Sequence, residues 1–206
     1  NVHPTTGDLF IADVGQVEWE EIDHAPTGGL NFGWPWRGGP VARGACTVPA
    51  DTAYDEPIQA FDHGEMTCIM SAGIYTRNGG RYQFPPEYDG DYFFSDYITG
   101  HLMRLRNIGG VWTFPPAVVG QHSPRVWAAG FQAVPDYAMG PDGALWYCRN
   151  YTEGEIRRIV YFFGIEEEEP PPEPDATPAD DAAYYDLQGR RVDNPKQNGL
   201  YFTRAG

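Results

Sequence analysis

The segment from Ala12 to Asp23 carries the residues of this chain that are best suited to chemistry. It reads Ala-Asp-Val-Gly-Gln-Val-Glu-Trp-Glu-Glu-Ile-Asp, so acids lie on both sides of one glycine. A tight glycine turn exposes backbone carbonyls that a regular strand would have paired, and the carboxylates add further oxygen atoms. The segment can therefore present a set of oxygen ligands. The alternative is that Asp13 and Glu21 are ordinary acids of a turn and an edge strand, and that Gly15 serves only the turn.

The elements that must position these residues repeat along the chain. Residues 7–13, 90–96 and 143–149 each have a turn glycine followed by an aromatic-rich strand. Each stretch is followed by a second β-like run, and these runs cover residues 19–23, 100–105 and 154–159. Gly143 follows Gly90 by 53 residues, about one propeller blade with an inserted loop. The pattern predicts an all-β chain made of about three consecutive blades of a β-propeller.

Composition shifts predict three parts. Residues 1–163 are blade material, with an irregular insertion rich in Gly and Pro from about Pro26 to Met70, and such loops often carry binding residues. Residues 164–183 contain eight acids, five prolines and no base, which predicts an extended, solvated linker. Residues 184–206 form two short strand-like runs and predict a small β appendage. Because three blades alone leave raw edges, we expect upstream blades of the same protein as partners.

Charge and cysteine content exclude several classes of function. The formal net charge is −15, which disfavours nucleic acid as a partner. No apolar run reaches the length that a membrane-spanning helix needs. Cys46, Cys68 and Cys148 show no Cys-x-x-Cys spacing, which disfavours a zinc site. Cys46 and Cys68 could form a disulfide if the protein is exported, whereas Cys148 is expected to be a buried thiol in a strand.

The first hairpin and the segments after it resemble a known family. The matching runs are Asp13-Val14-Gly15-Gln16, Glu20-Glu21-Ile22, the stretch from Gly28 to Pro35, the stretch from Phe84 to Phe94, and the stretch from Gly140 to Leu145. In order and spacing they are similar to the glucose/sorbosone dehydrogenase family of six-bladed propellers. That family includes soluble quinoprotein sugar dehydrogenases and non-enzymatic hedgehog-interacting proteins. The resemblance covers residues 1–163 and implies the C-terminal half of such a propeller.

The resemblance implies a set of metal and cofactor residues. In family members that bind the cofactor, two successive carbonyls of the hairpin turn hold a calcium ion that polarises pyrroloquinoline quinone. Those positions fall on Gly15 and Gln16. A second, structural calcium takes a carboxylate at the position of Glu21 and a carbonyl at the position of Phe32. These roles suit calcium, which prefers several oxygen ligands at flexible geometry.

Other positions depart from the family pattern. The two arginines that pair with the quinone's carboxylates fall on Ala133 and Pro135, and a cofactor lysine falls on Ile98. Arg125 or Arg149 could substitute for the missing charges, or they could be ordinary surface ion-pair residues. The family's catalytic histidine falls upstream of Asn1, so no residue of this chain is assigned as catalytic.

The end of the chain carries a second resemblance. Residues 185–192 and 198–202 are similar to C-terminal sorting modules of the bacterial type IX secretion system, which implies a secreted or cell-surface protein. Two hypotheses of function follow. The first is an oxidoreductase that oxidises a sugar or another small polyol with pyrroloquinoline quinone and calcium. The second is a propeller kept as a non-catalytic extracellular binding module, as in the hedgehog-interacting branch.

Overall fold

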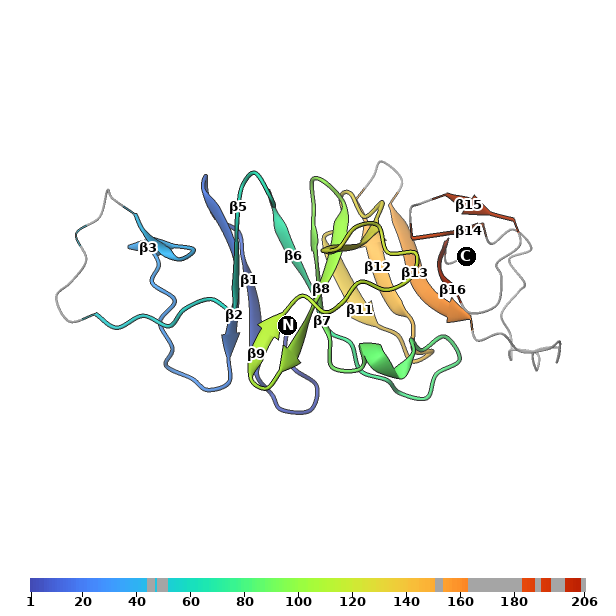
Figure 1. Cartoon of the computed structure of the whole chain (residues 1–206), viewed down its shortest axis with the longest axis horizontal. Coiled ribbons are helices and arrows are strands. Elements are labelled where there is room, and N and C mark those ends of the chain that lie inside the picture. The colour runs from blue at the N-terminus through green and yellow to red at the C-terminus, as the bar shows by residue number, and fades with distance from the viewer. Residues whose placement is uncertain are drawn as a thin grey trace.

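The structure is a computed structural model of the 206-residue chain. It describes residues 1–43, 47, 52–150, 154–162, 183–187, 190–193 and 199–204. Apart from one short 3-10 helix, η1 (Pro86–Tyr88), the regular elements in these ranges are β-strands. No helix among the described residues is long and apolar enough to cross a membrane. The sheets stand side by side along the longest axis of the molecule (Figure 1). This arrangement agrees with the prediction of an all-β, partial propeller.

The first sheet contains the segment that the sequence singled out. Its strand order is β1-β2-β5, with β1 at Leu9–Asp13, β2 at Trp19–Ala25 and β5 at Gln59–Asp62. A two-stranded hairpin, β3 (Arg37–Gly38) and β4 (Val41–Ala42), lies in the predicted insertion. Hydrogen bonds connect the two halves of the insertion. Arg37 donates two hydrogen bonds to the Glu56 carboxylate, at 2.6 and 2.9 Å. The Asn31 backbone amide also donates to Asp55.

The second sheet has the strand order β6-β7-β8-β10. Its strands are β6 (Ile69–Ile74), β7 (Tyr92–Asp96), β8 (His101–Ile108) and β10 (Val126–Ala129), and β9 (Val111–Thr113) pairs with the end of β8. Every residue of β7 is buried. Because side chains alternate between the two faces of a strand, both faces of this sheet must be covered by neighbours.

The third sheet has the strand order β11-β12-β13-β16-β14-β15. Its strands are β11 (Asp136–Met139), β12 (Leu145–Arg149), β13 (Glu155–Phe162), β14 (Tyr184–Tyr185), β15 (Arg191–Val192) and β16 (Gly199–Arg204). The three predicted hairpins are therefore confirmed. They are the antiparallel pairs β1–β2, β7–β8 and β12–β13.

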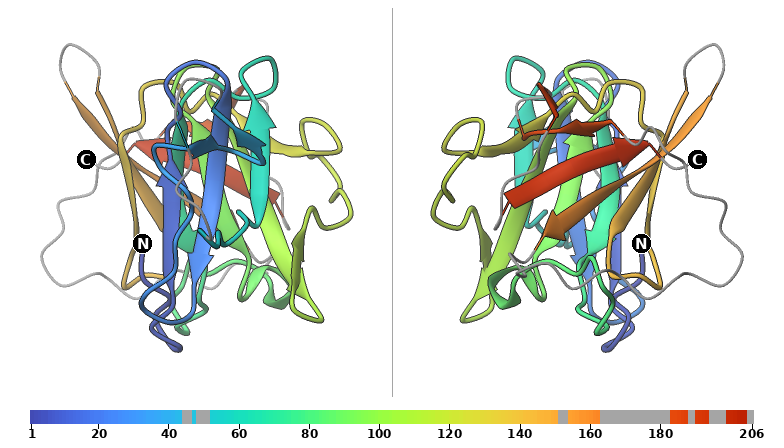
Figure 2. Two further views of the ribbon diagram at one scale, coloured as in Figure 1. Left: turned by 90° about the vertical axis from the view of Figure 1, so that its left-hand side faces the viewer. Right: turned by 90° about the vertical axis from the view of Figure 1, so that its right-hand side faces the viewer.

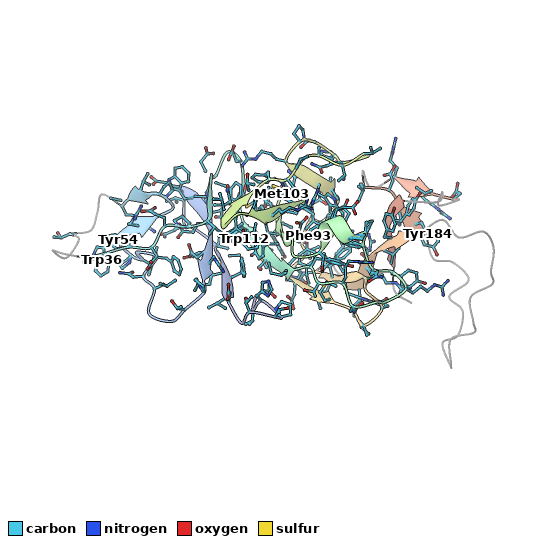
Figure 3. The ribbon with its side chains drawn as sticks, turned by 60° about the horizontal axis from the view of Figure 1, so that its bottom comes forward. Trp36, Tyr54, Phe93, Met103, Trp112 and Tyr184 are labelled. Atoms are coloured by element: carbon cyan, nitrogen blue, oxygen red, sulfur yellow. The ribbon has the colours of Figure 1, made fainter. Side chains whose placement is uncertain are left out.

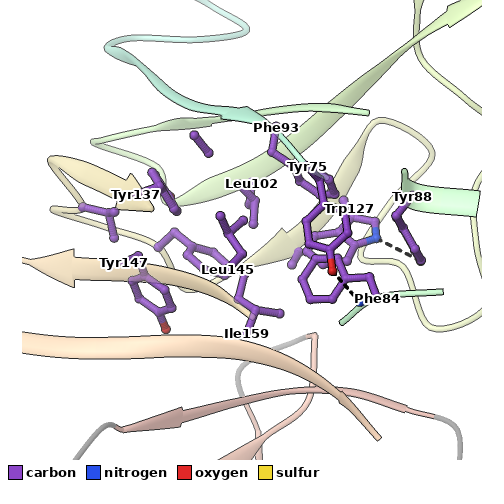
Figure 4. Packing of buried hydrophobic residues seen from close by; sticks show 14 of the residues in the cluster. Tyr75, Phe84, Tyr88, Phe93, Leu102, Trp127, Tyr137, Leu145, Tyr147 and Ile159 are labelled. Atoms are coloured by element: carbon purple, nitrogen blue, oxygen red, sulfur yellow. Dashed lines mark hydrogen bonds between the residues drawn. The ribbon is translucent and has the colours of Figure 1, made fainter. Parts of the chain in front are cut away.

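Two aromatic clusters join the sheets. Between the first and second sheets, Phe10 stacks on Tyr92 with ring centroids 4.9 Å apart and meets Trp112 edge-on at 5.1 Å. Between the second and third sheets, Phe93 and Trp127 pack with Leu145 and other residues (Figure 4). Figure 3 shows Phe93 and Trp112 in the middle of the molecule, with Trp36 and Tyr54 of the insertion at one end. Strand β7 thus supplies alternate side chains to both clusters, as the period of a strand requires.

The tail does not form a separate appendage. Strand β16 pairs with β13 over six residue pairs, from Arg157 with Arg204 to Phe162 with Gly199, and Figure 2 shows the two strands side by side. The carbonyl of Leu187 accepts a hydrogen bond from the Ala129 amide at 3.1 Å, and the Leu187 side chain is buried in the cluster between the second and third sheets. The physical reason is that β13 would otherwise expose an unpaired edge. The prediction of a detached module at 184–206 is corrected accordingly.

Two predictions concern residues outside the described ranges. The acidic linker at 164–183 lies there except for Ala183, and so does Cys46. Cys68 is a free cysteine, so the possible Cys46–Cys68 bridge is not formed in this structure. Cys148 is a free thiol on β12 and is partly rather than fully buried.

Candidate functional site

Three carboxylates meet on one face of the first sheet. Asp13 lies opposite Glu21 in the register of β1 and β2, and Asp23 follows Glu21 by two residues on the same face. One carboxylate oxygen from each residue lies within 4.8 Å of the others. This spacing would allow a single cation to bind all three.

The cluster is buried and short of hydrogen-bond donors. Asp23 is 1% exposed and Glu21 is 6% exposed. Among the described residues, Oε2 of Glu21 and Oδ1 of Asp23 are buried with no hydrogen-bond partner. A buried polar atom without a partner costs about 1 to 3 kcal/mol, and more when it is charged. Such atoms indicate a site for a positively charged ligand.

The pKa values of these carboxyl groups also indicate that the cluster has too little positive charge near it. Burial, and after it the negative charges of Glu21 and Asp13, raise the pKa of Asp23 to about 8. Burial first and Asp13 second also raise the pKa of Glu21, while the Gly39 amide and Arg37 act in the opposite direction. Arg37 offsets little because its guanidinium is paired with Glu56. Without a cation, the cluster is therefore stabilised by bound protons.

Strand β2 contains one further acid, Glu20, which can be compared with Glu21 and Asp23. Glu20 points to the opposite face and is fully buried. Its Oε2 accepts a hydrogen bond from the Ile69 amide and its Oε1 contacts Nε2 of His63, both at 2.8 Å. Burial still raises the pKa of Glu20, but both oxygens have partners. The protein thus supplies partners for both carboxylate oxygens of Glu20. Glu21 and Asp23, in contrast, each have one oxygen without a partner among the described residues.

The turn between β1 and β2 borders a cavity of about 210 Å³. Gly15 and Gln16 line it with Val17, Glu18 and Trp19, and Gly38 and Arg43 close it from the insertion. A Cβ atom on Gly15 would lie 1.6 Å from the Trp19 carbonyl oxygen, so only glycine fits this turn. The turn is therefore next to open space, as a ligand site requires. That the Gly15 and Gln16 carbonyls bind calcium stays a prediction.

Phe32, the other residue expected near Glu21, borders a second cavity. This cavity of about 490 Å³ is also lined by Leu9, Ile11 and Leu30. Ile11 and Asp13 share a face of β1, so Phe32 lies on the same side of the sheet as the carboxylate cluster. Its carbonyl as a calcium ligand stays a prediction. The sequence reasoning overlooked Asp23, which the two-residue spacing from Glu21 could have indicated.

The positions expected to hold cofactor cations lie close together but carry no charge. Ala133 has a positive φ of 57°. Its amide donates to the Tyr97 carbonyl at 2.9 Å, and its carbonyl accepts from the Asn150 amide at 2.7 Å. Ala133 therefore links the β7–β8 turn, which contains Ile98, to the end of β12. Ile98 is 57% exposed, and Pro135 is also exposed. These residues do not fit the carboxylates of pyrroloquinoline quinone.

The two arginines considered as substitutes are already engaged. Arg125 is paired with Glu65 at 2.9 Å and lies over the Phe114 ring. Arg149 donates to the Gln132 carbonyl at 3.4 Å and lies 3.8 Å from a Glu155 carboxylate oxygen. Neither supplies a spare charge to the turn that contains Ile98.

We expect weak binding of pyrroloquinoline quinone, because Ile98, Ala133 and Pro135 carry no positive charge. Each missing charge-assisted hydrogen bond is worth on the order of 1.5 to 3 kcal/mol, so three losses should weaken binding by roughly a thousandfold or more. In a fluorescence titration of the calcium-loaded chain with pyrroloquinoline quinone, we expect no saturation at micromolar concentrations. Submicromolar binding that survives both Arg125→Ala and Arg149→Ala would contradict this prediction.

The chain was compared with known families and with solved structures. No family model matches the chain. Among solved structures, the chain is similar to a glucose dehydrogenase, with a TM-score of 0.48, 20% identity, and coverage of 75% of this chain and 42% of that one. It is also similar to the soluble aldose sugar dehydrogenase from Escherichia coli in the apo-form, with a TM-score of 0.49 and 20% identity over 76% of this chain and 42% of that one. The chain thus spans less than half the length of these proteins.

Proposed function

We propose that this chain is part of a secreted, calcium-binding oxidoreductase of the sugar dehydrogenase type, acting on a sugar or another small polyol. The observation that carries the proposal is the cluster of the half-buried Asp13 with the buried Glu21 and Asp23. It lies at the base of the β1–β2 turn, beside the cavity that Gly15 and Gln16 line. The sequence runs of residues 12–23 and 28–35, which resemble the dehydrogenase family, build this same region.

The donor set fits calcium. Calcium takes several oxygen ligands, including carboxylates and backbone carbonyls, at flexible geometry. The cluster offers three carboxylates, of which two have oxygen atoms without a partner among the described residues. The ion would neutralise these charges and hold the β1–β2 turn against the insertion that covers Glu21. Its chemical contribution in a dehydrogenase would be to fix the geometry of the turn beside the bound ligand.

A calcium-dependent gain in stability tests the proposal. Calcium at a hundredfold excess over its dissociation constant should stabilise the chain by about 2.7 kcal/mol, because only the folded state brings the carboxylates together. Glu21→Gln keeps the size of the side chain but removes its charge, and it should abolish most of the calcium-dependent shift in melting temperature. Glu65→Gln is the matched control, since Glu65 is an exposed acid outside the cluster. An unchanged shift in Glu21→Gln would refute the calcium site.

A specific observation favours the second candidate, an extracellular binding module. The positions of Ile98, Ala133 and Pro135 hold no cation for a quinone cofactor. A propeller of this fold could retain calcium for stability and bind a sugar without oxidising it. The complete protein, with the blades expected upstream of this chain, should be assayed for sugar-dependent reduction of a dye with and without added quinone. Binding of sugar without dye reduction in either condition would favour the module over the enzyme.

A further inference from the structure

The cavity beside the β1–β2 turn contains a cation that the sequence comparison did not assign. Arg43 lines this cavity from the insertion. Its guanidinium lies 4.8 Å from the centroid of the Trp34 ring and donates a hydrogen bond to Oε1 of Gln16 at 3.3 Å. The stack on Trp34 and the bond to Gln16 orient the guanidinium at the edge of the cavity.

Arg43 has no acidic partner in the part of the chain that the structure describes. Across the described residues, no carboxylate lies within ion-pair distance of Arg43, whereas Arg37, Arg125 and Arg149 each have an acidic neighbour. A guanidinium has five N–H donors in a fixed plane, and the Gln16 contact uses one of them. The remaining donors can bind a planar anion in the bidentate manner typical of arginine and carboxylate.

The rest of the cavity suits a ring with hydroxyl groups. Trp19 lines the cavity, and its ring packs closely against Gly39, next to Gly38 in the cavity wall. Aromatic side chains are common in binding sites because they offer apolar area at a small entropic cost. The polar side chains of Gln16 and Glu18 also line the cavity. An apolar floor with a few polar groups around it is the usual composition of a small-molecule site.

We propose that this cavity binds a sugar that carries a carboxylate, such as a hexuronate, with the carboxylate on Arg43 and the ring against Trp19. The sugar part of this assignment rests on the proposed function, whereas the carboxylate part rests on Arg43 and its surroundings. The site deepens the proposed function by naming acidic sugars as its substrate class.

Calorimetric titration of the 206-residue chain with three ligands tests the assignment. The ligands are D-glucuronate, D-glucose and cyclohexanecarboxylate, which separate the carboxylate from the sugar ring. We expect glucuronate to bind at least about tenfold more tightly than either of the other two ligands. A difference of this size is what one charge-assisted bidentate contact contributes to affinity. Arg43→Gln should remove the preference for glucuronate over glucose, and Arg43→Lys should retain part of it because lysine keeps the charge but not the planar fork.

Arg81→Gln is the matched control. Arg81 is an exposed arginine whose guanidinium lies 5.4 Å from the Tyr82 ring centroid, and it lines none of the cavities described here. This variant should bind all three ligands as the unmodified chain does. Equal affinity for glucuronate and glucose, or a preference that survives Arg43→Gln, would overturn the site. Binding of cyclohexanecarboxylate as tight as that of glucuronate would overturn its assignment to a sugar. Selective glucuronate binding together with an unchanged calcium-dependent shift in Glu21→Gln would count against the proposed function and leave this site standing.

Discussion

Deleting residues 184–206 is expected to lower the stability of the chain by several kcal/mol. The deletion removes β16 from the edge of β13, where six residue pairs are in register, and removes the buried Leu187 side chain from the core. Each net backbone hydrogen bond contributes about 0.5 to 1.5 kcal/mol, and burying a leucine contributes about 1.5 to 3 kcal/mol. Thermal unfolding followed by circular dichroism should therefore show a melting temperature lower by roughly 10 °C or more.

Leu187→Ala separates packing from strand pairing. This variant keeps every backbone hydrogen bond of β16 and should cost about 2 to 4 kcal/mol, less than the whole deletion. Arg190→Ala is a suitable control, because Arg190 lies in the same tail and its side chain is 76% exposed. A melting temperature that is the same with and without the tail would instead support the detached sorting module that the sequence predicted.

Replacing Asp23 by Asn is expected to stabilise the metal-free chain at pH 8. The folded pKa of Asp23 is raised to about 8, above its ordinary value of 3.8. Between these two values the folded state holds a proton that the unfolded state has lost, so stability is greatest at low pH and falls as the pH rises toward 8. Asn avoids this loss. A shift of this size corresponds to a few kcal/mol at most, because the neighbouring carboxylates titrate together with Asp23.

Melting curves from pH 4 to pH 9 in a chelator would measure the effect. The unmodified chain should lose stability across this range, and Asp23→Asn should lose less. Asp193→Asn, which changes an exposed acid, should follow the unmodified chain. If Asp23→Asn were as pH-sensitive as the unmodified chain, the cluster would not be the source of the dependence. Saturating calcium should flatten the profile of the unmodified chain, because a bound cation replaces the protons.

The sequence by itself determined the local elements. Turn glycines followed by aromatic strands predicted the hairpins β1–β2, β7–β8 and β12–β13, because backbone conformation and side-chain alternation depend on neighbouring residues. The local pattern also identified residues 12–23 as a segment with oxygen ligands. The family resemblance, rather than the local pattern, assigned Glu21 to calcium and placed Ala133 and Ile98 where family members carry cations.

Only the tertiary structure decided how distant segments meet. The register of β1 against β2 brings Asp13, Glu21 and Asp23 together, and the insertion then buries them. The cavity containing Arg43 forms between the β1–β2 turn and a hairpin more than twenty residues later in the chain. The tail was predicted to be an appendage because it follows an acidic, proline-rich stretch. However, a strand needs a partner edge, and β13 provides one. Such contacts depend on which surfaces remain unpaired after the local elements form, and local residue patterns do not contain that information.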